Sequence, residues 1–326
     1  MRRSGFCSFI LTAFVAAAIP LAATAQSYPT RPVKLIVPFP AGSSADASAR
    51  LMGGELAKRL GQPFIVENLP GADGIIGAEA AKRAAPDGYT LFLSTNSTHA
   101  ANLSLYNKIP YDPEKDFTPI AGFVSVPMIL LVKGDFPAQD VAGFLKLAGQ
   151  RATADKPFNY GSGNTAGQVA AALLRSATKT ATTHVPYKGS PQALQDLVAG
   201  HIDFIFTDAF TPLALVNDGR IKALGVADQK RHPLYSQAPT MAEAGYPNVH
   251  VVAWNGFFAP AKTDPAIITR LNKEMNEVLS KPETIETLQK MALTPMKMMP
   301  AELGAFVSLE IVRWINNAVL AGLEMK

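Results

Sequence analysis

The mature part of this chain lacks cysteine. The single cysteine among the 326 residues is Cys7, and it lies in an N-terminal segment that we expect to be removed. A mature chain without thiols has no disulfide and no cysteine metal site. Neither sign of charge is in large excess, because 30 basic and 26 acidic side chains give a formal net charge of +4. No basic block with interleaved aromatic residues occurs, so nucleic acid is not expected as a partner.

Sequence signatures of enzymes and of nucleotide-binding proteins are missing too. The chain has no G-x-S-x-G nucleophile elbow and no H-E-x-x-H zinc motif. Its five histidines form no clustered ligand set. We therefore expect no catalytic residue, no metal and no cofactor.

The N-terminus has the pattern of a secretory signal peptide. Arg2 and Arg3 precede an apolar stretch at 9–22, and Ala23-Thr24-Ala25 forms an A-x-A cleavage site. An uncleaved membrane anchor is the alternative, but the stretch is short and Pro20 interrupts it. No later stretch approaches a transmembrane length. We predict cleavage after Ala25, export to the periplasm and a soluble mature protein.

Short β-branched runs alternate with longer stretches of helical spacing. Strands are predicted at 33–37, 64–67, 90–94, 128–132, 158–162, 184–187, 203–208 and 221–227. Strand–helix–strand alternation is typical of parallel sheets with right-handed crossovers. About 300 mature residues, with 48% hydrophobic residues in the whole chain, are enough for two lobes. The sequence therefore predicts an α/β protein.

The turn from Phe39 to Asp46 is the first candidate site. It joins a predicted strand directly to a predicted helix, so its free backbone N–H groups lie at the positive end of a helix dipole. That arrangement binds anions. Gly42 is its only glycine and no Gly-Lys-Ser/Thr follows, which excludes a dinucleotide fingerprint and a P-loop. The alternative is a plain connection that Ser43 or Ser44 caps.

A second turn of the same kind follows the strand that ends at Ser162. Gly163-Asn164-Thr165 leads into a helix rich in alanine and leucine. Here the alternative is again a simple helix cap. Chain crossings near 126–130 and 249–256 would form a hinge, so the two turns could face each other across a cleft and clamp an anion.

Motifs along the mature chain resemble the Bug-type extracytoplasmic solute receptors, the substrate-binding subunits of tripartite tricarboxylate transporters. The motifs that carry this resemblance are Tyr28-Pro-x-Arg-Pro32, Pro38-Phe-x-Ala-Gly42, Val66-Glu-Asn-x-Pro-Gly71, Pro86-Asp-Gly-Tyr-Thr90, Thr98-His-Ala100, Val185-Pro-Tyr-Lys-Gly189 and Trp254-x-Gly256. The resemblance implies a type II periplasmic binding protein fold. Its two lobes each have a central, mostly parallel sheet, and two strands form the hinge. We expect lobe 1 at 26–127 plus 252–326 and lobe 2 at 128–251.

The resemblance also implies which residues bind a small carboxylic acid. In lobe 1 these are Phe39, Ala41, Ser43, Ser44, Ala45, Asp46, Thr95 and His99. In lobe 2 they are Ser162, Asn164, Thr165, Gln168, Thr207 and Asp208. Three positions depart from the family pattern. Ser43 stands where a glycine is usual, Gln168 stands where a histidine is common, and Phe206-Thr-Asp208 replaces Phe-Asp-Asn.

Several of these side chains have a second interpretation. Asp208 either caps the segment that follows its strand or faces the cleft, where it would meet a hydroxyl, an ammonium or a bridging water. His99 is either a donor to the ligand or a hydrogen-bonded histidine near the surface. Asp46 is expected mainly to stabilise the start of its own helix.

The function expected from the sequence is a periplasmic receptor that captures a small carboxylate and delivers it to the membrane permease subunits of a tripartite transporter. The receptor is expected to act as a monomer and not as an enzyme. The alternative is a sensor subunit that presents its ligand to a chemoreceptor or a sensor kinase. Sequence does not separate these two functions, nor does it identify the acid.

Overall fold

The computed structural model describes residues 28–325, so the predicted signal peptide and its cleavage site lie outside the described residues. The strands are β1 (Val33–Val37), β2 (Phe64–Asn68), β3 (Thr90–Thr95), β4 (Phe117–Lys133), β5 (Phe158–Ser162), β6 (Thr182–Pro186), β7 (Phe204–Asp208), β8 (Ile221–Val226), β9 (Val252–Pro260) and β10 (Thr294–Pro295). The helices are α1 (Ser44–Leu60), α2 (Ile75–Lys82), α3 (Asn102–Leu105), α4 (Val141–Thr153), α5 (Thr165–Thr178), α6 (Ser190–Ala199), α7 (Leu213–Asn217), α8 (Pro265–Val278), α9 (Pro282–Lys290) and α10 (Pro300–Leu320). Short helical turns are η1 (Ala72–Gly74), η2 (Ser97–Ala101) and η3 (Pro233–Tyr235).

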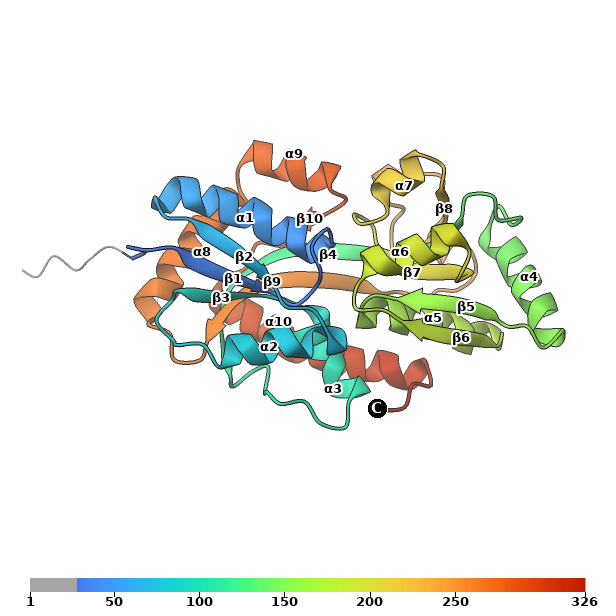
Figure 1. Ribbon diagram of the computed structural model, residues 1–326, viewed down its shortest axis with the longest axis horizontal. Coiled ribbons are helices and arrows are strands. Elements are labelled where there is room, and N and C mark those ends of the chain that lie inside the picture. The colour runs from blue at the N-terminus through green and yellow to red at the C-terminus, as the bar shows by residue number, and fades with distance from the viewer. Residues whose placement is uncertain (1–27, 326) are drawn as a thin grey trace, which may run out of the picture.

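The fold is α/β with two lobes, as the sequence predicted (Figure 1). The strands follow the order β2-β1-β3-β9-β4-β7-β5-β6, while β8 and β10 pair with β4. Pairs β1–β2 and β1–β3 are parallel in the first lobe, and β5–β6 and β5–β7 are parallel in the second. The pairs that β4 and β9 form are antiparallel. Each lobe thus has a parallel sheet that ends on the strands joining the lobes.

Strands β4 and β9 carry the chain between the lobes. Up to Pro127, β4 pairs with β9, and from Met128 onward it pairs with β7. The N–H of Met128 donates to the carbonyl oxygen of Val251 at 3.3 Å, where the chain returns to the first lobe. One continuous strand therefore belongs to both sheets, which places its middle at the junction of the lobes.

Helix α1 shows how local sequence positions the first candidate turn. Ala49, Met52 and Leu56 lie on one face at helical spacing and are fully buried against the first-lobe core. The helix begins after Ser43, whose side chain caps it, and ends at Gly61, which has φ 71°. Because its buried face is fixed against the sheet, the start of α1 is held at the carboxyl end of β1.

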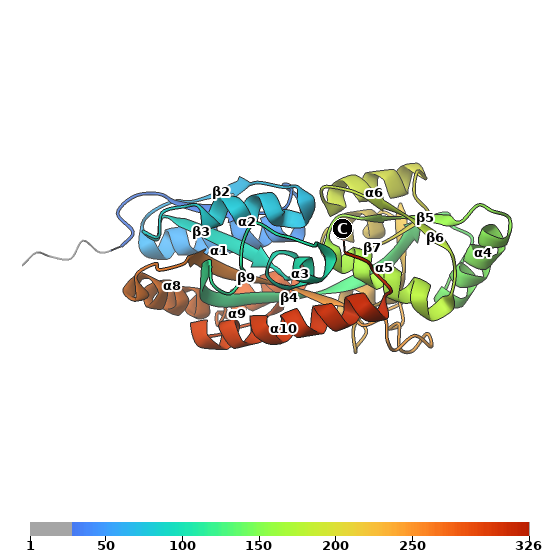
Figure 2. The ribbon, with the colours of Figure 1, turned by 90° about the horizontal axis from the view of Figure 1, so that it is seen from below.

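Helix α10 lies along the underside of both lobes (Figure 2). Leu303, Val307 and Trp314 face the body of the protein and are buried, whereas Leu309 and Val319 are exposed. By length and composition α10 could cross a membrane, and within residues 28–325 no other helix meets that test. Its buried face shows that it packs as part of the two-lobed fold.

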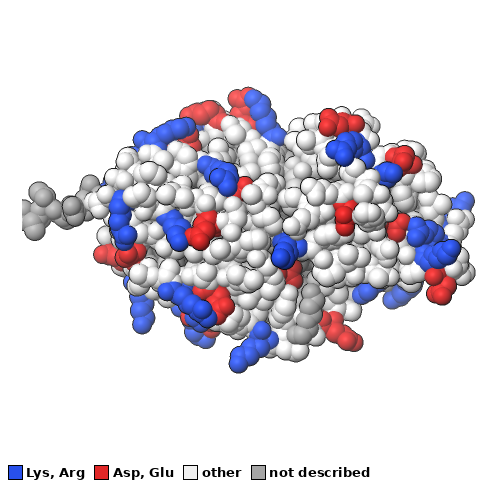
Figure 3. Space-filling view, in the orientation of Figure 1, with Lys and Arg blue, Asp and Glu red and all other residues white. Residues whose placement is uncertain are grey.

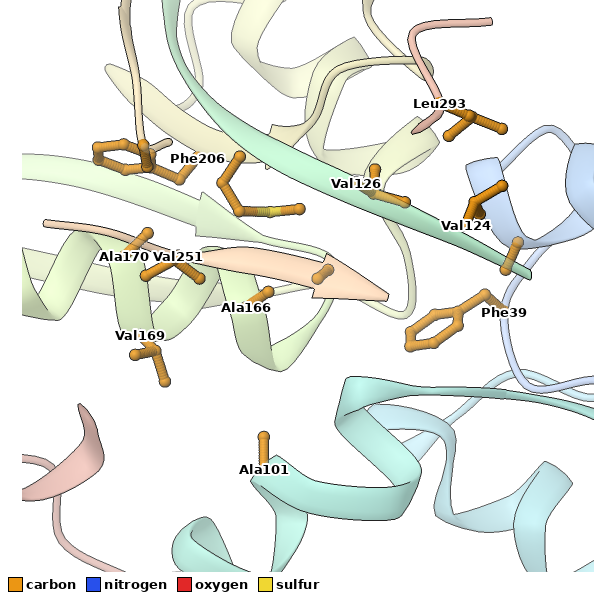
Figure 4. Close-up of a cluster of buried hydrophobic side chains, with 14 of the residues drawn as sticks. Phe39, Ala101, Val124, Val126, Ala166, Val169, Ala170, Phe206, Val251 and Leu293 are labelled. Atoms are coloured by element: carbon orange, nitrogen blue, oxygen red, sulfur yellow. The ribbon is translucent and has the colours of Figure 1, made fainter. Parts of the chain in front are cut away.

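The largest buried cluster joins the lobes near their junction. Figure 4 shows Val126 and Ala166 between Phe39 on one side and Phe206 on the other, and all four belong to one hydrophobic core cluster. The face of the molecule drawn in Figure 3 carries basic and acidic side chains intermixed. This distribution agrees with the small net charge of the sequence.

Candidate functional site

The start of α1 presents backbone N–H groups that have no partner within the helix. Ser43 Oγ accepts a hydrogen bond from the N–H of Asp46 at 3.3 Å and donates to the carbonyl oxygen of Pro40 at 2.7 Å. Ser44 and Ala45 are the first two helical residues, so their N–H groups have no carbonyl one turn earlier in the helix. Both residues line a cavity between the lobes.

Asp46 stabilises the turn that precedes α1. Its carboxylate accepts hydrogen bonds of 3.0 Å from Gly42 N, Arg50 Nε and Asn68 Nδ2. Burial opposes ionisation of Asp46, but the bonds from Arg50, Gly42 and Asn68 together hold its pKa below the usual value. Asp46 is not part of the cavity wall, which agrees with the expectation that it stabilises its own helix.

Two further polar residues of the first lobe lie at the carboxyl end of β3. Thr95 and Asn96 are buried and line the same cavity. Within residues 28–325, Thr95 Oγ1 and Asn96 Nδ2 have no hydrogen-bond partner. Buried polar groups are normally paired, so these two side chains have unused capacity at the cavity.

In the second lobe, the starts of α5 and α6 converge on the end of β7. Asn164 Oδ1 accepts from Gly167 N at 2.9 Å and so caps α5. Ser190, the first residue of α6, accepts a 2.7 Å hydrogen bond from the Thr207 hydroxyl. Ser190 and Asn164 line the cavity together with Asp208. The second lobe therefore contributes two helix N-termini, which favour negative charge.

Two glycines make this convergence possible. A Cβ on Gly163 would lie 2.1 Å from the backbone nitrogen of Ser190, and a Cβ on Gly167 would lie 2.2 Å from the carbonyl oxygen of Phe206. Real Cβ atoms do not approach so closely. Only glycine therefore lets α5 pack against both the start of α6 and the end of β7.

Asp208 is buried at the carboxyl end of β7, with 3% exposure. Its Oδ1 accepts hydrogen bonds from the N–H groups of Phe210 at 3.2 Å and Thr211 at 2.8 Å. Burial raises the pKa of Asp208, although the bonds from Thr211, Thr207 and Phe210 act in the opposite direction. Asp208 thus caps the following turn and also lines the cavity, and its contact with a ligand stays a prediction.

The cavity is narrow and has walls from both lobes. Its volume is about 30 Å³. The crossing strands contribute Val126, Met128, Ala253 and Asn255, and Phe39 adds an aromatic wall. Asp208 is the only charged side chain among the lining residues. An anion held here would be bound by helix N-termini and neutral donors rather than by an ion pair.

Contacts beside the cavity hold the lobes together. Thr165 Oγ1 donates to Ser97 Oγ across the gap at 2.7 Å. On another side Gly189 lies against Pro40, because a Cβ at Gly189 would be 2.5 Å from Pro40 Cδ. The two lobes are therefore closed on each other.

The cavity wall includes seven of the residues expected from the sequence. These are Phe39, Ser43, Ser44, Ala45, Thr95, Asn164 and Asp208. The wall does not include Ala41, Asp46, His99, Ser162, Thr165, Gln168 or Thr207. Of these, Ala41 is exposed, Ser162 Oγ is hydrogen-bonded to His184 Nε2 at 2.6 Å, and Gln168 is buried within α5. Contact of any of these side chains with a ligand stays a prediction.

His99 lies neither in the cavity wall nor near the surface. It is fully buried, with its ring centroid 4.2 Å from that of Phe258 and 4.8 Å from that of Phe117. Both ring nitrogens lack a partner within the part of the chain that the structure describes. Burial lowers the pKa of His99 to about 3, so it is neutral. The expectation of a hydrogen-bonded surface histidine is corrected by this aromatic packing.

Sequence reasoning missed several polar residues of the wall, namely Asn96, Ser97, Ser190 and Asn255. Asn96 and Ser97 follow a predicted strand directly, and that position was the available signal. Asn255 reaches the cavity through strand pairing, and Ser190 reaches it because α6 starts close against Gly163. Among residues 28–325, no group of three or more His, Cys, Asp or Glu side chains could hold a metal ion.

Two lobes that close on a narrow cavity and are joined by two crossing strands are the fold of periplasmic binding proteins. The chain belongs to the family of tripartite tricarboxylate transporter receptors, and the model of that family matches residues 48–319. The members are solute-binding receptors and not enzymes. The Bug resemblance seen in the sequence is thus confirmed.

Relatives and solved structures cover nearly the whole chain. Protein BugT of Bordetella pertussis is 33% identical over 98% of this chain and 96% of its own length. A solved R. palustris protein with adipate is 33% identical, with a TM-score of 0.88, and covers 92% of this chain and 100% of its own. MatC from Rhodopseudomonas palustris with bound malate is 33% identical, with a TM-score of 0.83, and covers 89% of this chain and 99% of its own.

Proposed function

We propose that this protein is a periplasmic receptor that captures a small carboxylate between its lobes and delivers it to the membrane subunits of a tripartite transporter. The observation that carries the proposal is the set of unpaired donors at one cavity. Ser44 and Ala45 offer helix N-terminal N–H groups, and Asn96 Nδ2 lacks a partner among the described residues. Such donors replace the water shell of a carboxylate.

Closure of the lobes adds to this binding. The Thr165–Ser97 hydrogen bond and the approach of Gly189 to Pro40 bring the two lobes into contact beside the cavity, and closed lobes hold bulk water away from a ligand between them. Hydrogen bonds are stronger where the local dielectric constant is low. The adipate and malate bound by two similar proteins support a carboxylate as the class of ligand.

Thermal unfolding with a panel of acids tests the proposal. Mono-, di- and tricarboxylates, amino acids and aromatic acids are each added to the purified mature protein, and neutral solutes of similar size serve as controls. A ligand at about a hundred times its dissociation constant adds roughly 2.7 kcal/mol to the free energy of unfolding. A shift of the melting temperature by at least one acid supports the proposal, whereas shifts by neutral solutes alone contradict it.

Delivery to a transporter and action as a monomer need separate measurements. We expect the ligand-loaded receptor to copurify with permease subunits encoded beside it and to elute as a monomer in size-exclusion chromatography. Capture of a sensor ectodomain in place of the permease would contradict the transport role while leaving carboxylate binding intact.

A further inference from the structure

The charge balance of the cavity singles out Asp208. No lysine or arginine lines the cavity, and Asp208 is its only carboxylate. The carboxylate is almost fully buried, so water does not screen it. A ligand carboxylate placed against Asp208 would bring two negative charges together without a cation between them.

The hydrogen-bond donors around Asp208 are distributed unequally between its two carboxylate oxygens. Oδ1 receives two backbone N–H groups, from Phe210 and Thr211. Oδ2 lies 2.9 Å from the Thr211 hydroxyl and 3.3 Å from the Thr207 hydroxyl. Thr207 is closer to Ser190 Oγ, at 2.7 Å, and Thr211 is also 2.8 Å from Oδ1.

Each hydroxyl has a single proton to donate. The Thr207 hydroxyl is shared between Oδ2 and Ser190 Oγ, and the Thr211 hydroxyl is shared between Oδ2 and Oδ1. Within residues 28–325, Oδ2 therefore receives only hydroxyl protons for which other acceptors compete, and no backbone N–H. A carboxylate oxygen has two acceptor sites. Among the described residues, the donors to Asp208 Oδ2 are these two shared hydroxyls, so Oδ2 has capacity for a further donor from a ligand, on a residue that lines the cavity.

The first-lobe wall carries donors and no carboxylate. Ser44 and Ala45 present N–H groups, and Asn96 Nδ2 has no partner among residues 28–325. The cavity of about 30 Å³ admits a ligand only when the lobes part. Such a ligand meets donors in the first lobe, whereas in the second lobe the acceptor Asp208 lies beside the starts of α5 and α6.

We propose that Asp208 is a specificity-determining residue that selects carboxylates whose far end donates a hydrogen bond, as an ammonium or a hydroxyl does, over dicarboxylates of equal length. The ligand carboxylate binds the first-lobe donors, and its far end donates to Asp208 Oδ2. This inference rests on the proposed function, because it requires a carboxylate at the first-lobe donors.

Calorimetric titration with length-matched acids tests the role of Asp208. One series is succinate, γ-hydroxybutyrate and γ-aminobutyrate, and a second is adipate, ε-hydroxycaproate and ε-aminocaproate. The titrations use the wild-type protein and Asp208→Asn. The variant keeps the shape of the side chain and its acceptor for the N–H groups of Phe210 and Thr211, but it loses the charge. A melting temperature close to that of the wild type shows that the variant is folded.

We expect the wild type to bind the amino or hydroxy acid of one series about tenfold to a hundredfold more tightly than the matching dicarboxylate, the range of a hydrogen bond to a charged group. In Asp208→Asn that ratio falls by at least about tenfold. The control is Asp155→Asn, which makes the same change at an exposed position before β5. Asp155 has φ 53°, a conformation that asparagine also tolerates, so this variant keeps the wild-type ratio.

Two results overturn the role of Asp208 while leaving the receptor function intact. One is a wild type that binds the dicarboxylate as tightly as its partners or more tightly. The other is a preference that Asp208→Asn leaves unchanged. Failure of every acid in both series and in the wider panel to bind contradicts the proposed function itself.

Discussion

Thr165 in the second lobe donates a hydrogen bond to Ser97 in the first lobe, with 2.7 Å between the two hydroxyl oxygens. Thr165 begins α5, and Ser97 follows β3 and lines the cavity. Movement of the lobes away from each other would break this bond, so its free energy contributes to closure and hence to ligand binding.

A double-mutant cycle measures that contribution. We predict that Thr165→Val and Ser97→Ala each weaken ligand binding, and that their effects are not additive. The coupling free energy should be about 0.5–1.5 kcal/mol, the net value of one hydrogen bond. Calorimetry on the two single variants, the double variant and the wild type gives this number. Strictly additive losses would show that the bond has no part in closure.

Asn96 offers a test of the donors that sequence reasoning missed. Its Nδ2 has no partner among residues 28–325, so Asn96→Ala removes no intramolecular hydrogen bond of that amide nitrogen. We predict that binding of the acid weakens by about tenfold or more, as expected for a donor to a charged group. The melting temperature without ligand should change little. A variant that loses stability but keeps its affinity would show that Asn96 is structural.

Gly163 is predicted to be essential for the second-lobe half of the site. In Gly163→Ala the new Cβ would collide with the backbone at Gly189 and Ser190, so α5 and α6 must separate. We expect the free energy of unfolding to fall by about 1–3 kcal/mol and ligand affinity to fall with it. Urea denaturation and calorimetry measure the two effects.

The matched control for Gly163→Ala is Gly149→Ala in α4. A Cβ at Gly149 would have nothing within 4 Å, and alanine is the better helix former by about 0.5–1 kcal/mol. This variant should be slightly more stable than the wild type and should bind the ligand normally. Equal behaviour of the two variants would contradict the packing role of Gly163.

His99 is predicted to make stability depend on pH. Burial lowers the pKa of His99 from 6.5 to about 3, so between these values the unfolded chain binds a proton that the folded protein does not. The free energy of unfolding therefore falls as the pH drops from about 6.5 toward 3, by about 1.4 kcal/mol per pH unit from this group. Its contribution is constant above pH 6.5.

The variant His99→Leu removes this dependence together with two unpaired buried nitrogens. The free energy of unfolding is measured by urea denaturation at pH 5 and at pH 8. In His99→Leu its decrease from pH 8 to pH 5 should be smaller than in the wild type by about 1–2 kcal/mol. The exposed His201 provides the control variant His201→Leu. An unaltered difference between the two pH values in His99→Leu would mean that another group causes the acid sensitivity.

Local sequence rules predicted the local structure of the first turn. The strand at Val33–Val37, the cap at Ser43 and the exposed N–H groups that follow depend on residues only a few positions apart. The same holds for Asn164, which caps α5. These positions can be predicted from the sequence because hydrogen bonds between residues close in the chain determine their conformation.

Residues that tertiary pairing brings to the cavity were not predictable in the same way. Asn255 reaches it because β9 pairs with both β3 and β4, and Ser190 reaches it because Gly163 lets two turns touch. His99 was misplaced for a related reason. It lies in η2, whose five residues are all buried. The sequence there has no alternation of polar and apolar residues that would indicate which side chains face solvent. Composition and periodicity do not reveal such packing.

The most direct test of the central claim is a crystal structure of the mature protein with the acid that gives the largest thermal shift. We predict that one carboxylate of the ligand lies within hydrogen-bond distance of the N–H groups of Ser44 and Ala45 and of Asn96 Nδ2, between closed lobes. A ligand bound outside this cavity, or one whose only carboxylate lies against Asp208, would contradict the claim.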